Sequence, residues 1–426
     1  MIRLVSVACL ALGANLGAAQ DLVVTNARII DGTDRVIASG TIVVRDGRIS
    51  SVTAGSVDLP GARVVDAQGM TAMPGLIDAH RHIIRGDPDQ WMRETAADNM
   101  REFLEAGFTT VLSAGDSLEH ILELRRLTAA GEITGPRIIA AGRVPLAAPT
   151  PGGGFTPGVD PARIDNSRPP HRPTEPAPAI PEQQTREQVR QLAAAGVDAI
   201  KTVIITTPGG PEQNTLSIVA DEAKRQGIAS ITHAVTVQDT LAAVRAGTHT
   251  LVHTPHIGLL TEQQSRLIVD SGIPMTTTLG IFMPTFAEDN RNIRNQTGED
   301  NLPRFRDLLP FPMDTISSAG EGPVNARILY DAGLVYGYGT DTTFHPEDSF
   351  KHEIRALRLV FSRRDLMRIM TRNAAAAILR SDDYGTLEAG KAADIVLLDG
   401  NPLADIDALF EVQVVIKGGE VVVDKR

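Results

Sequence analysis

The sequence predicts an α/β protein in which a (β/α)8 barrel of the TIM type is joined to a small β-sandwich built from both termini. Three observations predict it. The middle of the chain alternates strand-like and helix-like segments, and both ends are rich in short β segments and turns. Polar residues also interrupt the apolar strands near their carboxyl ends. In a parallel barrel those ends share one face, where catalytic groups converge.

Residues 1–19 have the layout of a secretory signal peptide. A single positive charge at Arg3 precedes an apolar run over residues 4–12, and small residues follow up to Ala19. The apolar run is too short to span a bilayer. We therefore expect export, with cleavage near Ala19 and a periplasmic or secreted mature protein.

Charge and cysteine content exclude several classes of function. Asp and Glu number 52 against 41 Lys and Arg, and the formal net charge is −11. Nucleic acid requires a clustered basic surface, so it is not an expected partner, and neither is a membrane. Cys9, in the predicted signal peptide, is the only cysteine. Any metal in the mature protein must therefore be held by ligands other than thiolate, such as His and carboxylate.

The two ends of the mature chain, residues 20–70 and 385–426, are predicted to form the β-sandwich together. The first end contains β-rich runs separated by the turn pairs Asp31-Gly32 and Asp46-Gly47, which are typical of hairpins. The second end repeats this pattern around Gly418-Gly419. Two β-rich ends around a different middle indicate one domain assembled from both termini.

Residues 71–384 are predicted to form the barrel. Its first strand is expected over residues 71–83 and is followed by one helix over residues 91–106. Further helical segments separate the later strands, which gives the eight strands that such a barrel needs. These later strands are expected to begin near Phe108, Arg137, Val197, Ala229, Thr250, Ile273 and Leu334.

An insertion over residues 144–181 interrupts this alternation. It is dense in Pro and Gly, has almost no periodicity, and is too long for an ordinary loop inside a compact domain. Because it follows the third strand of the barrel, we expect it to lie over the carboxyl face as a lid. The alternative is a surface loop without a role at the site.

Six polar residues lie near the carboxyl ends of the predicted strands. Two of them, His80 and His82, are one residue apart, so the pleat of a strand directs both to the same side. Neutral imidazole is a common ligand of zinc and related metals. Each residue has a structural alternative, such as a satisfied core histidine, but all six together favour a metal site. The six are His80, His82, Lys201, His233, His253 and Asp341.

Several motifs resemble the metal-dependent amidohydrolase superfamily. They are P-G-L-I-D-A-H-R-H at 74–82, G-V-D-A-I-K at 196–201, T-H-A at 232–234, A-G-T-H-T-L-V-H at 246–253 and G-T-D at 339–341. The chain is similar in particular to the imidazolonepropionase-like branch, which includes Xaa-Pro and Xaa-Arg dipeptidases, and to the neighbouring amidases that hydrolyse ochratoxin. The resemblance covers nearly the whole mature chain.

This resemblance implies a site for two divalent metal ions. His80, His82 and Asp341 would hold one ion, and His233 and His253 would hold the other. Lys201 would be carboxylated by carbon dioxide, and its carbamate would bridge the ions. An unmodified Lys201 would leave a site for a single ion. Zinc is the default metal, with manganese, cobalt and iron as alternatives for a site of nitrogen and oxygen ligands.

The chemistry that the resemblance implies is hydrolysis of a small-molecule amide by a hydroxide that bridges the metals. Asp341 would be the catalytic base and then the acid that protonates the leaving amine. The expected substrates are N-acyl amino acids or dipeptide-like amides, including bulky aryl amides such as ochratoxin A. A lactone or cyclic-amide hydrolase is the alternative, and a noncatalytic scaffold is disfavoured because all six ligands are present. Relatives are often symmetric oligomers, so a homo-oligomer is compatible with the resemblance.

Two further histidines are candidate substrate contacts. His256 follows His253 by three residues, and His345 follows Asp341 by four. Either could polarise a carbonyl or bind a substrate carboxylate, and either could be a structural loop residue. Five apolar residues could line a pocket for an aromatic group, with core packing as the alternative. These are Trp91, Phe282, Met283, Phe286 and Phe344.

Four arginines are candidate partners of a substrate carboxylate by charge alone. They are Arg81, Arg85, Arg143 and Arg168. Arg81 alternates with His80 and His82, so it points to the opposite side of the strand and is expected to be structural. Arg85 is retained as a substrate-binding candidate.

Overall fold

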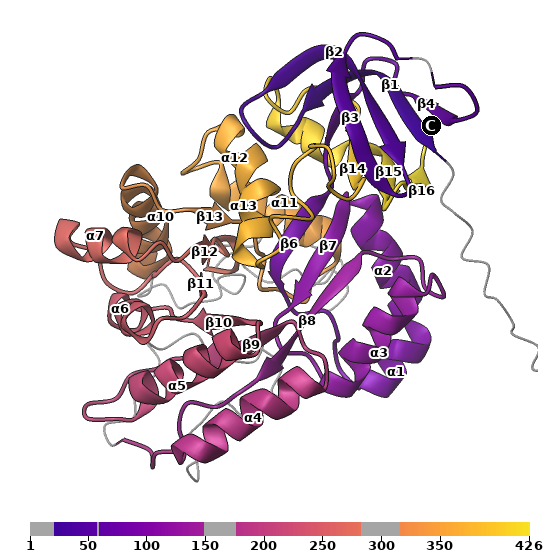
Figure 1. The fold of residues 1–426 in the computed structure, drawn as a ribbon. Coiled ribbons are helices and arrows are strands. Elements are labelled where there is room, and N and C mark those ends of the chain that lie inside the picture. The colour runs from indigo at the N-terminus through magenta and orange to yellow at the C-terminus, as the bar shows by residue number, and fades with distance from the viewer. Residues whose placement is uncertain (1–20, 58, 149–175, 283–315) are drawn as a thin grey trace, which may run out of the picture.

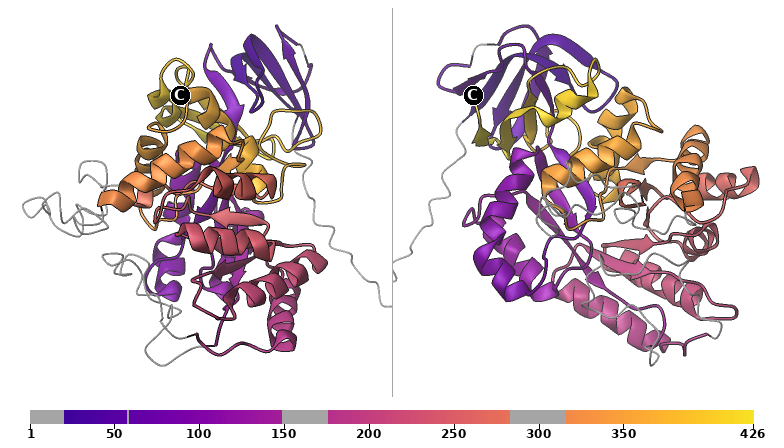
Figure 2. Two further views of the ribbon diagram at one scale, coloured as in Figure 1. Left: turned by 90° about the vertical axis from the view of Figure 1, so that its left-hand side faces the viewer. Right: turned by 180° about the vertical axis from the view of Figure 1, so that it is seen from behind.

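The computed structural model describes residues 21–57, 59–148, 176–282 and 316–426. A sheet built from both termini lies at one end of a parallel barrel that is surrounded by helices (Figure 1, Figure 2). The predicted fold class is therefore confirmed. The predicted signal peptide, residues 1–19, lies outside the described residues, and so do residues 149–175 of the predicted lid. Within the described ranges, no helix combines the length and the apolar character needed to cross a membrane.

The terminal strands form one continuous sheet that packs around its own apolar core, which includes Ile29, Ile42 and Leu397. Its order is β16-β15-β14-β5-β1-β2-β3, with β4 paired to β1. The two ends of the chain meet where β5 and β14 pair antiparallel. The strands are β1 (Leu22–Ile30), β2 (Val36–Arg45), β3 (Arg48–Ala54), β4 (Arg63–Asp66), β5 (Thr71–Pro74), β14 (Ile395–Leu398), β15 (Val412–Lys417) and β16 (Glu420–Asp424).

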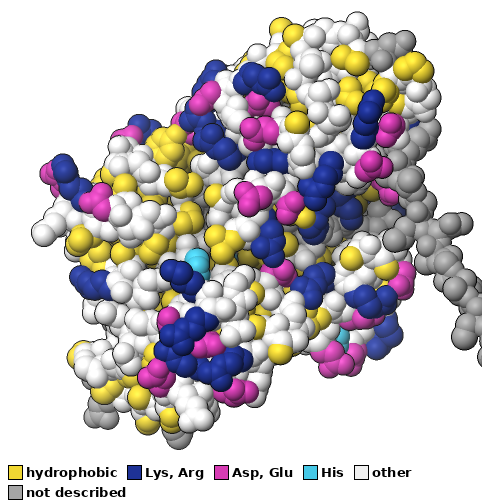
Figure 3. Space-filling view, in the orientation of Figure 1, with side chains coloured by type: hydrophobic (Ala, Val, Ile, Leu, Met, Phe, Trp, Pro, Cys, Tyr) yellow, Lys and Arg dark blue, Asp and Glu magenta, His cyan; other side chains and the backbone are white. Residues whose placement is uncertain are grey.

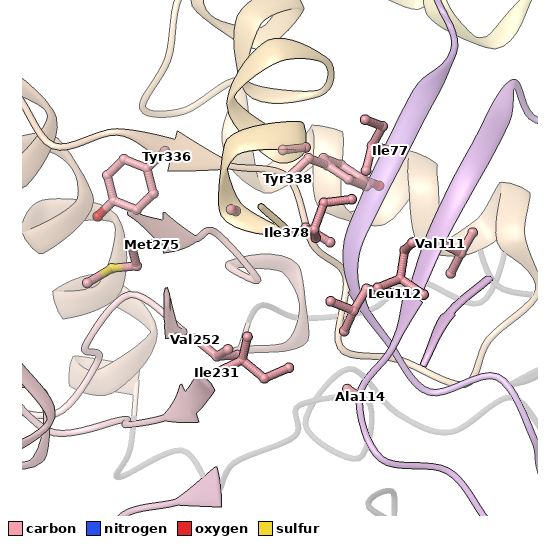
Figure 4. Close-up of a cluster of buried hydrophobic side chains, with 14 of the residues drawn as sticks. Ile77, Val111, Leu112, Ala114, Ile231, Val252, Met275, Tyr336, Tyr338 and Ile378 are labelled. Carbon is pink, nitrogen blue, oxygen red and sulfur yellow. The ribbon is translucent and has the colours of Figure 1, made fainter. Parts of the chain in front are cut away.

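The barrel is a parallel eight-stranded sheet in which each strand pairs with the next one along the chain. Side chains from most of these strands form a shared buried core (Figure 4). The strands are β6 (Leu76–Arg81), β7 (Phe108–Ser113), β8 (Arg137–Arg143), β9 (Ala199–Val203), β10 (Ala229–His233), β11 (Thr250–Val252), β12 (Met275–Thr276) and β13 (Tyr336–Gly337).

Helices connect the strands around the outside of the barrel (Figure 1). They are α1 (Pro88–Glu94), α2 (Ala96–Glu105), α3 (Leu118–Ala129), α4 (Glu182–Ala194), α5 (Glu212–Arg225), α6 (Val237–Ala246), α7 (Glu262–Asp270), α10 (Ile316–Asp331), α11 (Pro346–Leu357), α12 (Arg363–Ile369) and α13 (Arg372–Ala377), with short 3-10 helices η2 (Gly280–Phe282) and η6 (Ile406–Phe410). Acidic and basic side chains are interspersed over the face in Figure 3 rather than gathered by sign.

Two predicted elements are divided in the structure. The strand expected over residues 71–83 becomes β5 and β6, which belong to different sheets. They are separated at Gly75, where a Cβ atom would come within 2.1 Å of Thr109 Oγ1, so only glycine fits as the chain passes between the sheets. The helix expected over residues 91–106 is broken at Thr95, whose φ of −125° lies outside the helical range.

The barrel closes through backbone hydrogen bonds between β6 and the segment that follows β13. Ala79 N donates to Tyr338 O over 2.9 Å, and His80 O accepts from Thr340 N and from Asp341 N, at 3.1 and 2.8 Å. These bonds join the first strand of the barrel to its last. They also place His80 directly beside Asp341.

Two buried charged residues reinforce this closure. Asp78 accepts hydrogen bonds from His80 N at 3.1 Å and from Thr340 Oγ1 at 2.7 Å. Arg81 donates to the hydroxyl groups of Thr340 and Thr342, at 3.1 and 2.7 Å, which confirms its predicted structural role. Burial raises the pKa of Asp78 to about 6, while the attraction of Arg81 opposes that rise. The two charges therefore compensate each other inside the protein.

We expect Arg81→Met to lower the free energy of unfolding by about 3–5 kcal/mol, because it leaves the buried charge of Asp78 uncompensated. Denaturant titration followed by circular dichroism measures this change. Arg126→Met is the control, since Arg126 pairs with Glu123 and Glu132 at the surface and its loss should change stability little. Equal stability of the two variants would contradict the role given to Arg81.

Candidate metal centre

The structure brings together the six polar residues that the sequence singled out. His80 lies near the end of β6, His82 directly follows that strand, and Lys201 comes from β9. His233 ends β10, His253 follows β11, and Asp341 follows β13. The cluster therefore forms at the carboxyl face because parallel strands all end there.

Asp341 lies between two sets of imidazoles. Its Oδ1 atom is 3.2 Å from His80 Nε2 and 3.1 Å from His82 Nε2. Its Oδ2 atom is 3.5 Å from His253 Nε2. Each carboxylate oxygen thus faces a different set of nitrogen atoms.

His233 and Lys201 are the remaining two residues of the cluster, and each contacts one of these histidines. His233 Nδ1 lies 2.6 Å from His253 Nε2, and Lys201 Nζ lies 2.9 Å from His80 Nε2. His253 Nδ1 lies 2.7 Å from Thr278 Oγ1, which can accept a hydrogen bond from a protonated Nδ1. In that tautomer His253 Nε2 carries a lone pair directed toward His233 and Asp341.

Burial sets the protonation of the cluster. It lowers the pKa of His80 and of His233 to about 3 and lowers the pKa of His253 well below its ordinary value. Burial would raise the pKa of Asp341, but the neighbouring His253 and His80 hold it well below its usual range. Burial also lowers the pKa of Lys201 to about 7. Neutral imidazoles around an ionised carboxylate are the forms that bind metal ions.

Backbone strain is concentrated at the same place. His253, Thr278 and Asp341 have φ angles of 75°, 45° and 51°, in the left-handed region that residues other than glycine rarely adopt. Each such conformation costs on the order of 1 kcal/mol or more and persists only where surrounding contacts impose it. The chain therefore accepts strain at two residues of the cluster and at the threonine that orients one of them.

The residues fit a metal ion. The ligand atoms of His80, His82 and Asp341 all lie within 4.8 Å of one another, which is close enough for one ion to be held by all three. At His233 and His253 two imidazole nitrogens approach to 2.6 Å, and only one proton fits between them. Lone pairs that converge in this way are suited to a cation.

Phe282 lies beside the cluster. Its ring contacts that of His253 edge to face, with centroids 5.6 Å apart, and stacks on His256 at 3.6 Å. Glu353 on α11 holds the segment that carries Phe282, since it accepts hydrogen bonds from Leu279 N and Gly280 N. Phe282 thus provides an apolar surface next to His253.

The other predicted substrate contacts lie in different surroundings. His256 is buried under Phe282, and burial lowers its pKa to about 3. The Nδ1 atom of His345 lies 2.9 Å from Glu102 Oε2 on α2, a helix that packs against β7 and α11. Arg85 is half-buried in the loop that follows His82. Their roles toward a substrate stay predictions.

Only some of the residues predicted to line an apolar pocket lie near the cluster. Phe282 lies beside the cluster, whereas Trp91 belongs to the hydrophobic core, 4% exposed. Phe344 is half-buried, and its carbonyl oxygen accepts a hydrogen bond from Arg81. Met283 and Phe286 lie outside the described residues.

Two residues that support the site were not predicted. Thr278 orients His253, and Asp116 accepts hydrogen bonds from Ile83 N at 3.0 Å and Ser113 Oγ at 2.7 Å, which fixes the loop after β6. A signal existed for Thr278, because it ends a run of three threonines at the carboxyl end of an otherwise apolar strand.

A parallel barrel with a buried cluster of histidine, lysine and aspartate at its carboxyl face has the ligand types and the position suited to a hydrolase that uses metal ions. The sequence profile of the amidohydrolase family matches residues 71–422. The chain belongs to that family. Because the family name denotes hydrolysis of amide, that is carbon–nitrogen, bonds, the protein is an enzyme of this hydrolase class.

Individual relatives agree with this assignment. Imidazolonepropionase of Thermoanaerobacter pseudethanolicus is 22% identical over 412 residues, which cover 85% of this chain and 84% of the relative. A Xaa-Pro dipeptidase with bound methionine is 22% identical, with a TM-score of 0.73 over 94% of this chain and 99% of that one. Ochratoxinase of A. niger is 19% identical, with a TM-score of 0.69 over 95% and 96%. A dihydroorotase of Elusimicrobium minutum is 34% identical, but the match spans only 20% of its length and 21% of this chain.

We expect Thr278→Val to weaken metal binding by about 10- to 100-fold, because it removes the hydroxyl that orients His253. Titration of the metal-loaded protein with a chelator measures this change. Thr276→Val is a matched control, since Thr276 Oγ1 is buried and has no hydrogen-bond partner among the described residues. Equal retention of metal by the two variants would show that Thr278 has no such role.

Proposed function

We propose that the protein hydrolyses the amide bond of N-acyl amino acids or dipeptide-like substrates with the help of two divalent metal ions. The observation that carries this proposal is the position of Asp341, whose two oxygens face separate sets of imidazoles. A carboxylate so placed can assist both metals and stay within reach of a reacting water. Zinc is the proposed metal, as expected for ligands that are mostly imidazole.

A carboxylated Lys201 fits this proposal. Carbon dioxide reacts with an uncharged amine, and burial lowers the pKa of Lys201 to about 7, so that form is well populated at neutral pH. The amine lies 2.9 Å from His80 Nε2, one of the proposed ligands of the first ion. Conversion to a carbamate would replace a buried cation by an anion that can bridge two ions.

In the proposed hydrolysis, the metal ions and the residues around them would have different roles. Two bound ions would acidify a water molecule and polarise the substrate carbonyl. Asp341 would take a proton from the attacking water and deliver it to the leaving amine. Phe282 would contact an apolar or aromatic part of the substrate next to His253. Bulky aryl amides such as ochratoxin A belong to this class, and the fold likeness to ochratoxinase agrees with it.

A lactone or cyclic-amide substrate is the second candidate. The local match to dihydroorotase favours it, since dihydroorotate is a cyclic amide. The same residues could open a ring, because Asp341 would protonate a leaving nitrogen or oxygen in either case. Linear and cyclic substrates therefore belong in the same assay.

We expect the protein loaded with zinc and bicarbonate to hydrolyse at least one member of a panel of N-acyl amino acids and dipeptides. Asp341→Asn should lower kcat by about 100- to 10,000-fold, as expected for loss of a general acid–base. Asp89→Asn is the matched control, because Asp89 is 75% exposed and pairs only with His120 among the described residues.

Initial rates of acyl-group release measure these effects. Activity on lactones or cyclic amides alone would replace the first proposal by the second. Full activity of Asp341→Asn would contradict the role of Asp341 as the general acid–base.

Carboxylation of Lys201 should depend on pH in a defined direction. With a pKa of about 7 before metal binds, the uncharged fraction of the amine grows as the pH rises from 6 to 8, so carbamate formation at a fixed carbon dioxide pressure should rise over this range. The NMR signal of isotopically labelled carbon dioxide bound to the metal-loaded protein measures it. Lys201→Met should give no such signal, and an equal signal in that variant would assign the carbamate elsewhere.

We also propose that the protein is exported. The proposal depends on residues 1–19, whose charge and apolar run are typical of a cleaved signal peptide. The amino-terminal sequence of the protein recovered from outside the cytoplasm tests it. A chain that retains Met1 and stays in the cytoplasm would contradict export.

A further inference from the structure

We propose that Arg143 binds the free carboxylate of the substrate and thereby makes the enzyme selective for amides that carry one. This inference rests on the proposed amide hydrolysis and deepens it, because it specifies the leaving group as an amino acid with an unmodified carboxyl group. The inference assigns this role to Arg143 and not to the other candidate arginines.

The position of Arg143 in the sheet directs its side chain toward the metal centre. Arg143 is the last residue of β8, and it lies directly opposite Lys201 of β9 in the parallel register. Residues that face each other across parallel strands point to the same side of the sheet. Lys201 points into the barrel, where it contacts His80, so Arg143 shares that side at the carboxyl rim.

A glycine makes room for this side chain. A Cβ atom on Gly115, in the loop after β7, would lie 2.5 Å from Arg143 Nε and 2.7 Å from Arg143 Cγ. Gly115 also has a φ of 95°, which other residues rarely adopt. The loop continues into Asp116, which is held by Ser113 and Ile83. Arg143 therefore lies along a fixed loop rather than extending freely into solvent.

Arg143 carries its positive charge close to the cluster. Burial lowers the pKa of Arg143, and the carboxylates of Asp116 and Asp341 oppose that lowering, so the guanidinium keeps its charge and lies within electrostatic range of the cluster. Arg143 is also exposed enough to be reached by a ligand. A guanidinium offers two parallel N–H donors to a carboxylate, which fixes the orientation of the bound group.

The other candidate arginines are placed differently. Arg81 is buried and committed to hydroxyl groups at the closure of the barrel. Arg168 lies outside the described residues. Arg85 lies in the loop after His82, close enough to Arg81 for their charges to repel. Among the candidate arginines in the described part of the chain, Arg143 is the one whose strand register pairs it with a residue of the metal centre.

The test compares pairs of substrates that differ only in the carboxyl group. Each pair is an N-acyl amino acid and its primary carboxamide, chosen as the best-cleaved acid of the panel. For Arg143→Met we expect kcat/KM toward the acid to fall by about 100-fold, mainly through KM, and toward the carboxamide to change by less than about threefold. Arg143→Lys should recover part of the preference, because lysine keeps the charge and loses the paired donors.

Matched variants separate Arg143 from its neighbours. Arg85→Met tests the competing arginine, and Arg126→Met tests a surface arginine on α3. We expect Arg126→Met to leave the preference for the acid over the carboxamide unchanged, and Arg85→Met to reduce it less than Arg143→Met does. Loss of the preference in Arg85→Met with its retention in Arg143→Met would overturn the assignment, and so would an equal loss of both activities in Arg143→Met.

Binding distinguishes failure of this inference from failure of the proposed function. Calorimetric titration of a free amino acid, which has the carboxyl group but no amide bond to cleave, into the metal-loaded protein should show a dissociation constant raised by at least about tenfold in Arg143→Met. If the wild-type protein cleaves no amide, the proposed function fails, and this titration alone decides on Arg143. Equal binding of the amino acid by both proteins would then refute the inference.

Discussion

The constraint on which the rest of the structure depends is the closure of the barrel between β6 and the segment after β13. The carbonyl oxygen of His80 accepts hydrogen bonds from the amides of Thr340 and Asp341. The same bonds that complete the sheet therefore bring the imidazole of His80 to the carboxylate of Asp341. Asp78 and Arg81 add a buried pair of charges to this closure. The site is complete only when the barrel is closed, since no local segment contains both halves.

The site suits cations through an arrangement that includes backbone strain and buried polar groups, both of which lower the stability of the fold. His253, Thr278 and Asp341 adopt left-handed backbone conformations, and burial lowers the pKa values of His80, His233 and His253. A histidine nitrogen lies 2.6 Å from another, and an amine lies 2.9 Å from a third. These close contacts between nitrogen atoms add little stability by themselves, whereas bound cations would be ligated by the lone pairs that converge there. Bound metal should accordingly stabilise the folded protein through its preference for the native state.

The sequence was sufficient for the architecture and for the cluster, because both depend on short-range periodicity. His80 and His82 are related by the pleat of one strand, and Lys201, His233, His253 and Asp341 all lie near strand ends. The features that could not be predicted from the sequence depend on contacts between distant segments. The division at Gly75 is imposed by Thr109 of the neighbouring strand, and His345 faces Glu102 of α2, which lies 243 residues away. The distinction between Arg143 and Arg85 likewise required the register of β8 against β9.

The central claim is that six side chains from five strand ends hold two metal ions. Elemental analysis of the purified protein tests it most directly, with protein concentration determined by amino-acid analysis. The account predicts about two transition-metal ions per chain, lost together on chelation and regained with zinc and bicarbonate. Absence of bound metal after incubation with zinc or manganese and bicarbonate would contradict it.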